Sequence, residues 1–253
     1  MKVVVSYSGG VCSWYAAKLA IEQYGKEQVT LLFADTKFED IDLYRFLQET
    51  SEQFGIPVTT LCDGRTPWDV FFDERYLGNS RIDPCSKHLK RNLLEKWQNE
   101  NMTAGDIVVV GMGQGEQGRF RDYTARLAPS GLVAWAPALY TPKWQMLEAL
   151  RDASIDPPEL YEEGFPHNNC GGFCIKAGMA HFRLLLAKRR EFYLYNERKE
   201  EELRQHLGKN VSILRDRSGG KSRPLTLKVF RERIERGQVM QCVDWGGCGC
   251  AID

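Results

Sequence analysis

A short stretch near the amino terminus carries the residue types that bind phosphate. Ser8-Gly9-Gly10 follows the apolar run Val3–Val5, and Ser13 precedes a segment with the pattern of a helix. A strand, a glycine-bearing turn and a helix in succession point backbone N–H groups and a helix N-terminus at an anion. The glycines permit a tight turn, and the two serines add hydroxyl donors. No GxxxxGK[ST] sequence surrounds the stretch, so it is not a Walker A loop. We expect Ser8, Gly9, Gly10 and Ser13 to hold phosphate or pyrophosphate; a glycine turn without a ligand is the alternative.

Soft metal ligands gather in the last third of the chain. Cys170 and Cys174 are separated by three residues, and Cys248 and Cys250 flank Gly249. Four thiolates suit Zn(II) or a [4Fe–4S] cluster, and the neighbouring glycines leave the backbone free to wrap around it. The spacing is neither that of a zinc ribbon nor that of a ferredoxin. We expect an iron–sulfur cluster, with structural zinc or unligated cysteines as alternatives.

Another candidate thiol lies in the segment Asp83–Arg91. Asp83 is placed to cap a helix and Pro84 fits the first helical position, so Cys85 would lie in the first turn. The helix dipole and the lysine and arginine residues that follow would lower the pKa of this thiol and favour the thiolate. A thiolate can ligate metal or hold sulfur. A small buried apolar residue is the alternative.

Polar residues also follow two expected strands. Asp35 and Thr36 end an apolar run, and Arg119 and Arg121 lie in the glycine-rich stretch Gly111–Asp122. Ligands of open parallel sheets bind at the carboxyl ends of the strands. We therefore expect Asp35 and Thr36 near the nucleotide or its metal, and the two guanidinium groups on phosphate or sulfate. An N-cap role for Asp35 and a flexible surface loop for the arginines are the alternatives.

Alternating strand and helix signals position these residues. The expected strands are Val3–Ser6, Val29–Ala34, Val58–Leu61 and Ile107–Val110, and the helices between them are Trp14–Tyr24, Ile41–Phe54 and Pro84–Trp97. This alternation predicts βαβ units and a parallel sheet. Later helices are expected at Cys174–Ala187, Arg189–Leu207 and Leu225–Arg236. We predict an α/β protein in which residues 1–165 form a Rossmann-like nucleotide-binding domain and residues 166–253 a helical, Cys-rich region that binds metal or a cluster.

Composition and charge bound the class of protein. A chain of 253 residues that is 43% hydrophobic can bury a sizeable core. It has no apolar run long enough for a membrane span, and it enters a strand without a signal peptide, so we expect a cytoplasmic protein without membrane contact. There, eight cysteines indicate metal or redox chemistry rather than a disulfide framework.

Residues 176–236 hold seventeen Lys and Arg against eight Asp and Glu. A basic face of this kind could meet nucleic-acid phosphates, although a solvated helical face is an equal alternative.

The first two motifs resemble those of a known superfamily. Ser8–Ser13 is similar to the SGGxDS signature of the PP-loop ATP pyrophosphatases, the adenine nucleotide alpha hydrolase-like superfamily, with Cys12 in place of the usual Asp. The segment from Phe33 to Glu39 resembles the F-x-D-T-x-x-E stretch of phosphoadenosine phosphosulfate (PAPS) reductases, which lies beside adenosine. The resemblance implies a Rossmann-like PP-loop fold of the HUP type. It also implies ATP or an adenylyl sulfate as the nucleotide, with Mg²⁺.

The remaining motifs resemble the PAPS reductase branch less closely. The loop from Gly111 is loosely similar to the arginine loop of that branch. The segment around Cys85 resembles the Cys-Cys-x-x-x-Lys element of assimilatory sulfate-reduction enzymes, with Ser86 at the second cysteine and Lys90 at the lysine. In adenosine phosphosulfate (APS) reductases that pair shares a cluster with a later CxxC. The resemblance therefore also allows Cys85, Cys170 and Cys174 as three cluster ligands with a tail cysteine as the fourth, and it gives catalytic roles to Cys85, Asp35 and Lys90.

Three activities compete within this resemblance. We expect ATP-dependent sulfur transfer to a nucleic acid or nucleotide, as in DNA phosphorothioation and tRNA thiolation. The partners would be tRNA or DNA and a sulfur donor or thiol reductant protein, and a homodimer is a candidate assembly. The runner-up is a PAPS or APS reductase that releases sulfite, although the Glu-Cys-Gly-x-His tail of those enzymes is absent. Amide-forming ligases form the third subgroup. The non-enzymatic alternative is a nucleotide- or nucleic-acid-binding protein with structural zinc.

Overall fold

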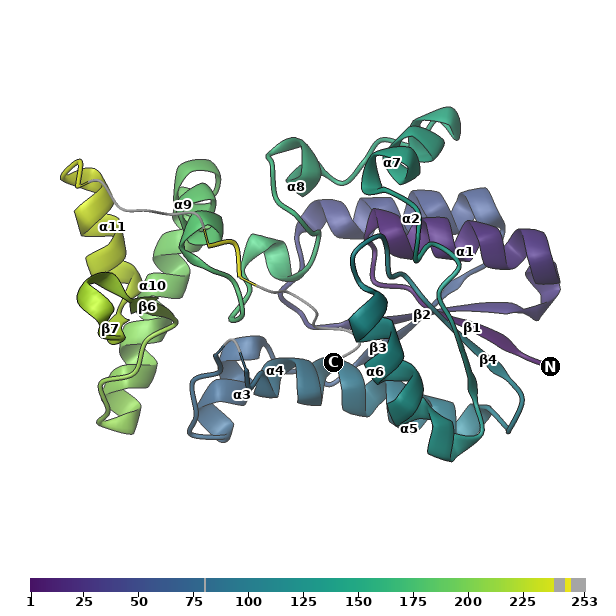
Figure 1. Cartoon of the computed structure of the whole chain (residues 1–253), viewed down its shortest axis with the longest axis horizontal. Helices are drawn as coiled ribbons and strands as arrows, with labels where there is room; N and C mark the ends of the chain where they lie inside the picture. Colours follow the sequence, from purple (N-terminus) through teal and green to yellow (C-terminus); the bar gives the residue numbers. More distant parts are fainter. Residues whose placement is uncertain (80, 239–243, 247–253) are drawn as a thin grey trace.

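The centre of the fold is a five-stranded parallel sheet, seen in the computed structural model of the chain, which describes residues 1–79, 81–238 and 244–246 (Figure 1). The strand order is β3-β2-β1-β4-β5, so β1 pairs with β2 on one side and with β4 on the other. The strands are β1 (Val3–Ser6), β2 (Val29–Asp35), β3 (Val58–Cys62), β4 (Ile107–Val110) and β5 (Val133–Trp135). This sheet confirms the predicted α/β class.

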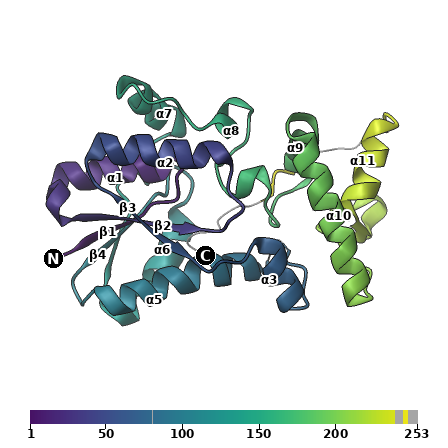
Figure 2. The ribbon, with the colours of Figure 1, turned by 180° about the vertical axis from the view of Figure 1, so that it is seen from behind.

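Helices cover both faces of the sheet (Figure 2). One face packs against α1 (Val11–Tyr24), α2 (Ile41–Phe54) and α7 (Lys143–Asp152), and the other against α5 (Asn92–Asn101) and α6 (Gln117–Leu127). Side chains of β1 alternate between the two layers: Val3 and Val5 join the first, and Val4 joins the second. A strand buried on both faces needs an unbroken apolar run, which explains the Val-Val-Val sequence.

The predicted elements are largely present, with differences at turns and short segments. The expected helix from Pro84 is divided into α4 (Pro84–Ser86), a π-helical turn η2 (Lys87–Arg91) and α5. The helix predicted at Cys174–Ala187 begins only at Met179, because the residues before it form a turn. The sequence analysis missed α3 (Pro67–Asp73), α6 and β5, which are short or follow a glycine-rich loop.

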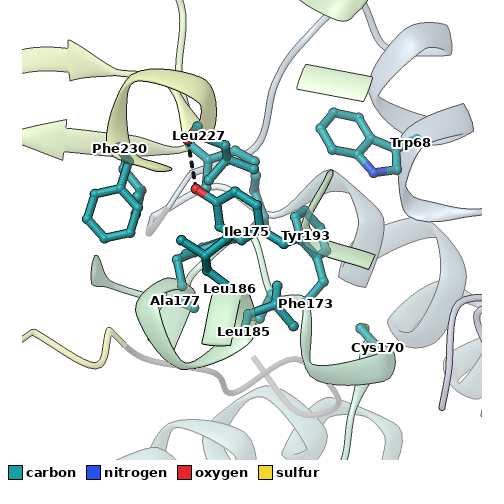
Figure 3. Packing of buried hydrophobic residues seen from close by; sticks show 14 of the residues in the cluster. Trp68, Cys170, Phe173, Ile175, Ala177, Leu185, Leu186, Tyr193, Leu227 and Phe230 are labelled. Carbon is teal, nitrogen blue, oxygen red and sulfur yellow. Dashed lines mark hydrogen bonds between the residues drawn. The ribbon is translucent and has the colours of Figure 1, made fainter. Parts of the chain in front are cut away.

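A second core, shown in Figure 3, holds the C-terminal region together. This region lies beyond the carboxyl ends of the strands (Figure 1). Its elements are α8 (Glu159–Glu162), η4 (Cys170–Gly172), α9 (Met179–Lys188), α10 (Arg190–Leu207), β6 (Leu214–Asp216), η5 (Ser218–Gly220), β7 (Arg223–Leu225) and α11 (Leu227–Glu235). The predicted helical character is confirmed, and the antiparallel β6–β7 hairpin was not predicted.

Polar contacts inside this second core fix its parts. Trp68 of α3 donates its indole N–H to Asn196 Oδ1 of α10 at 2.8 Å, and Tyr193 donates its hydroxyl to the carbonyl of Leu227 at 2.7 Å. The buried carboxyl group of Glu200 accepts the backbone N–H groups of Ile213 and Leu227, at 2.8 and 2.6 Å. The core thus joins α3, from the first 165 residues, to the C-terminal helices. None of the helices in the described ranges is both long and apolar enough to cross a bilayer.

Candidate functional site

The phosphate-binding motif lies at the point where the strand order of the sheet reverses. The chain leaves β1 through Ser8, Gly9 and Gly10 into α1, and it leaves the neighbouring strand β4 through Gly111. In open α/β sheets the crevice outside the carboxyl ends of two such strands is where ligands bind. The topology therefore places the motif where its predicted function requires.

Two glycines make this turn fit. Gly9 has a φ of +73°, a conformation that residues with a Cβ rarely adopt. A Cβ on Gly111 would lie 2.6 Å from the backbone N and Cα of Ser13. The loop after β4 can therefore pass directly over the first turn of α1 only because residue 111 lacks a side chain. The two loops form one surface.

A cavity of about 280 Å³ opens on that surface. It is lined by hydroxyl groups, by glycine backbone and by two cationic side chains, and the segments that contribute come from four separate parts of the chain. The lining residues are Ser8, Gly10, Cys12, Ser13, Gly111, Gly113, Gln114, Glu116, Arg119, Lys143, Met146, Tyr161, Pro166, His167, Asn168 and Asn169. Four of the predicted nucleotide-binding residues, Ser8, Gly10, Ser13 and Arg119, are thus brought together in one cavity.

Three helices begin at this cavity, and none has a hydrogen bond from its own N-cap side chain, although the first N–H group of α1, on Val11, donates to the Tyr161 hydroxyl at 3.3 Å. The N-cap residues of α1, α6 and α7 are Gly10, Glu116 and Pro142, and the first turns of all three helices contain no acidic residue. The first N–H groups of a helix have no partner within the helix, and the helix dipole adds a partial positive charge there. Three such ends around one cavity favour an anion, and phosphate is the anion most often bound in this way.

Lys143 is a further cation in this cavity, and the sequence analysis missed it. It is the first residue of α7, its ammonium group donates to the carbonyl of Pro166 at 2.7 Å, and it lies 3.9 Å from the ring centroid of Tyr161. Burial lowers the pKa of Lys143. A cation at the positive end of a helix is unfavourable by itself, so this placement is typical of a site that binds a negative ligand. Its signal in the sequence is weak, because it is a single lysine after Pro142 with no motif around it.

Cys12 also lines the cavity. Burial raises the pKa of its thiol, although the nearby ammonium group of Lys143 acts in the opposite direction. The thiol is therefore neutral at physiological pH, and Cys12 adds no negative charge to the cavity. Among the described residues that line it, Glu116 is the only carboxylate. Glu116 forms an ion pair with Arg119 at 2.5 Å and accepts the N–H of Gly113 at 2.8 Å.

Asn168 is a buried residue at the inner wall of the cavity. Its side-chain N–H donates to the carbonyl of Gly9 at 2.9 Å and so connects the C-terminal region to the phosphate-binding turn. Its Oδ1 is buried and has no hydrogen-bond partner within the described part of the chain. A buried acceptor without a donor is costly, and it is commonly completed by a ligand or water. No sequence pattern singled out this residue.

The other predicted nucleotide-binding residues lie outside the cavity lining. Asp35 ends β2 and accepts hydrogen bonds from the Tyr44 hydroxyl at 2.9 Å and the Lys37 N–H at 2.8 Å. Burial raises the pKa of the Asp35 carboxyl, but its hydrogen bonds to Lys37 and Tyr44 outweigh burial and hold the pKa below the ordinary value. Asp35 is therefore ionised in this arrangement. Arg121 lies on the exposed side of α6 beside Asp122, at 3.2 Å.

A buried ion pair joins the end of β2 to residues 166–178, which carry Cys170 and Cys174 and are called the cysteine loop. Lys90, in the π-helical turn η2, lies 3.4 Å from Glu39, and both side chains are buried. Glu39 also accepts the hydroxyl of Thr36 at 2.9 Å and the backbone N–H of Cys170. Thr36 and Lys90 are thus linked through one carboxylate to the loop that carries Cys170. The catalytic role of Lys90 stays a prediction.

Three of the predicted cysteine ligands belong to one region. Cys170 and Cys174 are buried in the second core, and Cys85 is half-buried against it. Cys248 and Cys250 lie outside the described residues. Within the described ranges, no three His, Cys, Asp or Glu side chains form a group that could hold a metal ion. The predicted metal site therefore stays a prediction.

The segment 244–246 approaches the cysteine loop closely. The backbone N–H of Gly178 donates to Trp245 at 3.1 Å, and that of Ala180 donates to Asp244 at 2.9 Å. A Cβ on Gly178 would lie 2.2 Å from the Asp244 carbonyl, and one on Gly246 would lie 2.3 Å from the Lys176 carbonyl. Both glycines are required for this approach. Gly246 therefore lies beside the loop that holds Cys174, and Cys248 and Cys250 follow it in the sequence.

Comparisons with known proteins give a limited result. No protein-family model matches this chain. No curated protein matches it either. Among solved structures, it is similar to the crystal structure of phosphoadenylyl-sulfate (PAPS) reductase from Candida auris in a phosphate complex, with 12% sequence identity and a TM-score of 0.48, over 65% of this chain and 79% of that chain. The assignment of the fold class rests on the parallel sheet itself.

Proposed function

We propose that the cavity at the carboxyl ends of β1 and β4 binds the phosphates of an adenine nucleotide. The observation that carries this proposal is the convergence of three helix N-termini and two cationic side chains, Lys143 and Arg119, on one cavity. The turn Ser8–Gly10 and the hydroxyl group of Ser13 complete the cradle. Asn168 Oδ1 offers an acceptor to a hydroxyl or amino group of the bound nucleotide.

The same cavity suits chemistry at a phosphorus atom. Helix N-termini, Lys143 and Arg119 would stabilise the negative charge that develops on the phosphate oxygens when the leaving group departs. Mg²⁺ would be held mainly by phosphate oxygens and water, with Glu116 as the nearest protein carboxylate. Asp35 and Thr36 would lie on the adenosine side of the site, at the end of β2.

The reaction we propose is the ATP-dependent replacement of oxygen by sulfur in a nucleic acid or nucleotide. A carbonyl oxygen of the acceptor attacks the α-phosphorus, a new P–O bond forms, and pyrophosphate leaves with the electron pair of the broken P–O bond. A hydrosulfide ion then attacks the activated carbon, and AMP leaves with the electron pair of the C–O bond. The proton that the acceptor nitrogen loses in the first step is balanced by the one that hydrosulfide brings. No net oxidation or reduction occurs.

The cysteines would bind the metal group that holds the sulfur before its transfer. Cys85, Cys170 and Cys174 lie in or against one apolar core, and soft thiolate ligands sheltered from water fit a [4Fe–4S] cluster or Zn(II). The close approach of 244–246 to Gly178 supports a further ligand from Cys248 or Cys250. When bound, a cluster held by only three of these cysteines would have one iron not ligated by protein, which would supply a place for sulfide, and a fourth cysteine ligand would remove that place. Lys90 and Glu39 would position the Cys170 loop relative to the nucleotide.

One experiment tests this proposal and separates it from its alternatives. The full chain is purified without oxygen, its iron, sulfide and zinc are quantified, and it is incubated with ATP carrying a label in the α-phosphate, hydrosulfide and total tRNA or DNA. We expect AMP and pyrophosphate in equal amounts and label-free, sulfur-containing nucleic acid. Release of sulfite from an adenylyl sulfate would instead support a reductase. Zinc without iron, together with binding but no turnover of ATP, would support a binding protein.

A further inference from the structure

A second cavity, of about 800 Å³, lies on the other side of the cysteine loop. The loop connects the two: residues 166–169 line the phosphate cavity, Cys170 and Cys174 follow, and residues 175–179 line the second cavity. Its other walls come from the loop after α3, from residues 210–217 around β6, and from Asp244 and Gly246. A molecule bound here would therefore lie next to the cysteines, on the side away from the nucleotide.

Four cationic side chains line this second cavity against one carboxylate among the described residues. The cations are Arg81, Lys176, Arg215 and Arg217, and the carboxylate is Asp244. Lys176 lies 3.6 Å from Asp83, and Arg217 lies 3.6 Å from Asp244 in an exposed pair. Within the described ranges, neither Arg81 nor Arg215 has a carboxylate partner; the guanidinium group of Arg215 donates only to Ser222, at 3.1 and 3.2 Å. The cavity is therefore electropositive.

Two features favour a polymer over a small anion. The positive charge continues outside the cavity on exposed side chains of the neighbouring turn and hairpin, Lys209, Lys221 and Arg223. The ring of Tyr76, which is 37% exposed, also lines the cavity, and its hydroxyl accepts a hydrogen bond from the Asn79 side chain at 2.5 Å. A row of cations next to an aromatic ring is the combination with which proteins hold the backbone and stack the bases of a single strand.

We propose that this second cavity binds a single-stranded segment of nucleic acid. Arg81 and Arg215 bind its phosphates, Tyr76 stacks against a base, and Asn79, Asn210 and Ser212 offer polar contacts. This inference rests on the proposed function in one respect, because it identifies the strand as the acceptor of sulfur. The cysteine loop then separates the strand from the ATP site and lies against both.

Binding of labelled 12-nucleotide strands tests this inference without ATP. Fluorescence anisotropy is measured with the full chain and with oligo-dT and oligo-U, at several salt concentrations between 50 and 200 mM. The double variant Arg81→Ala with Arg215→Ala is compared with the control Arg151→Ala, because Arg151 is an exposed residue of α7 that lines neither cavity. We expect the double variant to bind at least tenfold more weakly. The slope of log K against log salt should fall by about 1.4, since each phosphate contact on a single strand contributes about 0.7.

Several outcomes would overturn the inference. The first is that the unaltered protein does not bind the strands. The second is that the double variant and the control bind them with equal affinity and equal salt slope. The third is that pyrophosphate competes fully with the strands. Tyr76→Leu provides a second check: it keeps the charge, and it should weaken binding of both strands without changing the salt slope. Calorimetry with ATP on the same preparations separates the two proposals. Normal ATP binding with no strand binding would refute this inference alone, and strand binding without ATP binding would refute the proposed function alone.

Discussion

Replacement of Lys143 by glutamine should weaken ATP binding without weakening the fold. Lys143 places a cation at the first position of a ten-residue helix, where it opposes the helix dipole by about 0.3–1 kcal/mol. Its cation–π contact with the Tyr161 ring stabilises the folded state by about 0.5–1 kcal/mol. The two effects nearly cancel, and a glutamine amide can still donate to the Pro166 carbonyl. The free energy of unfolding should therefore change by less than about 1 kcal/mol.

The effect on the nucleotide should be much larger. A hydrogen bond between a charged donor and phosphate contributes about 1.5–3 kcal/mol, which corresponds to about a tenfold to hundredfold loss of affinity. Isothermal titration calorimetry with ATP measures this loss, and urea unfolding measures stability. Arg151→Gln is the matched control, because it removes one charge from the exposed end of the same helix. Burial lowers the pKa of Lys143 below the ordinary lysine value. ATP affinity of the unaltered protein should therefore decline as the pH rises through this lowered pKa, because the ammonium group loses its charge. The reasoning is refuted if Lys143→Gln binds ATP as tightly as Arg151→Gln does.

Three further predictions follow from single residues. Gly111→Ala should lower the free energy of unfolding by about 1–3 kcal/mol and ATP affinity at least tenfold, because its Cβ would lie 2.6 Å from the backbone of Ser13. Gly118→Ala is the control, because the space around its Cβ is open. Equal ATP affinities of the two variants would contradict the close approach. Gly178→Ala should displace 244–246 and lower the iron or zinc bound per chain by at least half, measured by elemental analysis; an unchanged metal content would exclude a ligand from beyond residue 246. Burial, with a smaller effect of His167, lowers the pKa of His181 to about 4. As the pH falls, the unfolded chain binds a proton at this histidine before the folded chain does, so the free energy of unfolding should fall by about 1.5 kcal/mol between pH 6.5 and pH 5. In urea unfolding, His181→Gln should remove that fall, and a variant that keeps the full pH dependence would refute it.

The elements of the sheet could be predicted because their signals are local. Val3–Val5 is an apolar run between polar neighbours, and Gly9 and Gly10 mark the turn that follows. Alternation of such strands with amphipathic helices leaves few arrangements other than a parallel sheet. The phosphate-binding turn was found for the same reason, since its strand, glycines and serines are adjacent in the sequence.

The other half of the cavity could not be predicted, because long-range packing builds it. Lys143 and Asn168 carry no motif, and they meet Ser8 only because α7 and the loop before Cys170 fold over the ends of the strands. Arg119 and Arg121 are two residues apart, yet the helix α6 directs one into the cavity and the other to its exposed side. Spacing in the sequence does not show which face of a helix a neighbouring loop will cover.

The cysteine region illustrates a different limit. Cys85 and Cys174 are 89 residues apart, and the core that gathers them also takes Trp68 and Phe71 from α3, a helix that was not predicted. Their shared surroundings became visible only in the fold. By contrast, the requirement for glycine at 178 and 246 has no local signal at all, because each is set by the backbone of the other segment.

A crystal structure of the full chain with ATP and Mg²⁺ tests the central claim most directly. We predict the triphosphate in the cavity between Ser8–Ser13 and Gly111–Arg119, with a phosphate oxygen within hydrogen-bond distance of Lys143 Nζ and the adenosine toward the end of β2. An empty cavity at saturating ATP, or a nucleotide bound elsewhere on the chain, would contradict the account.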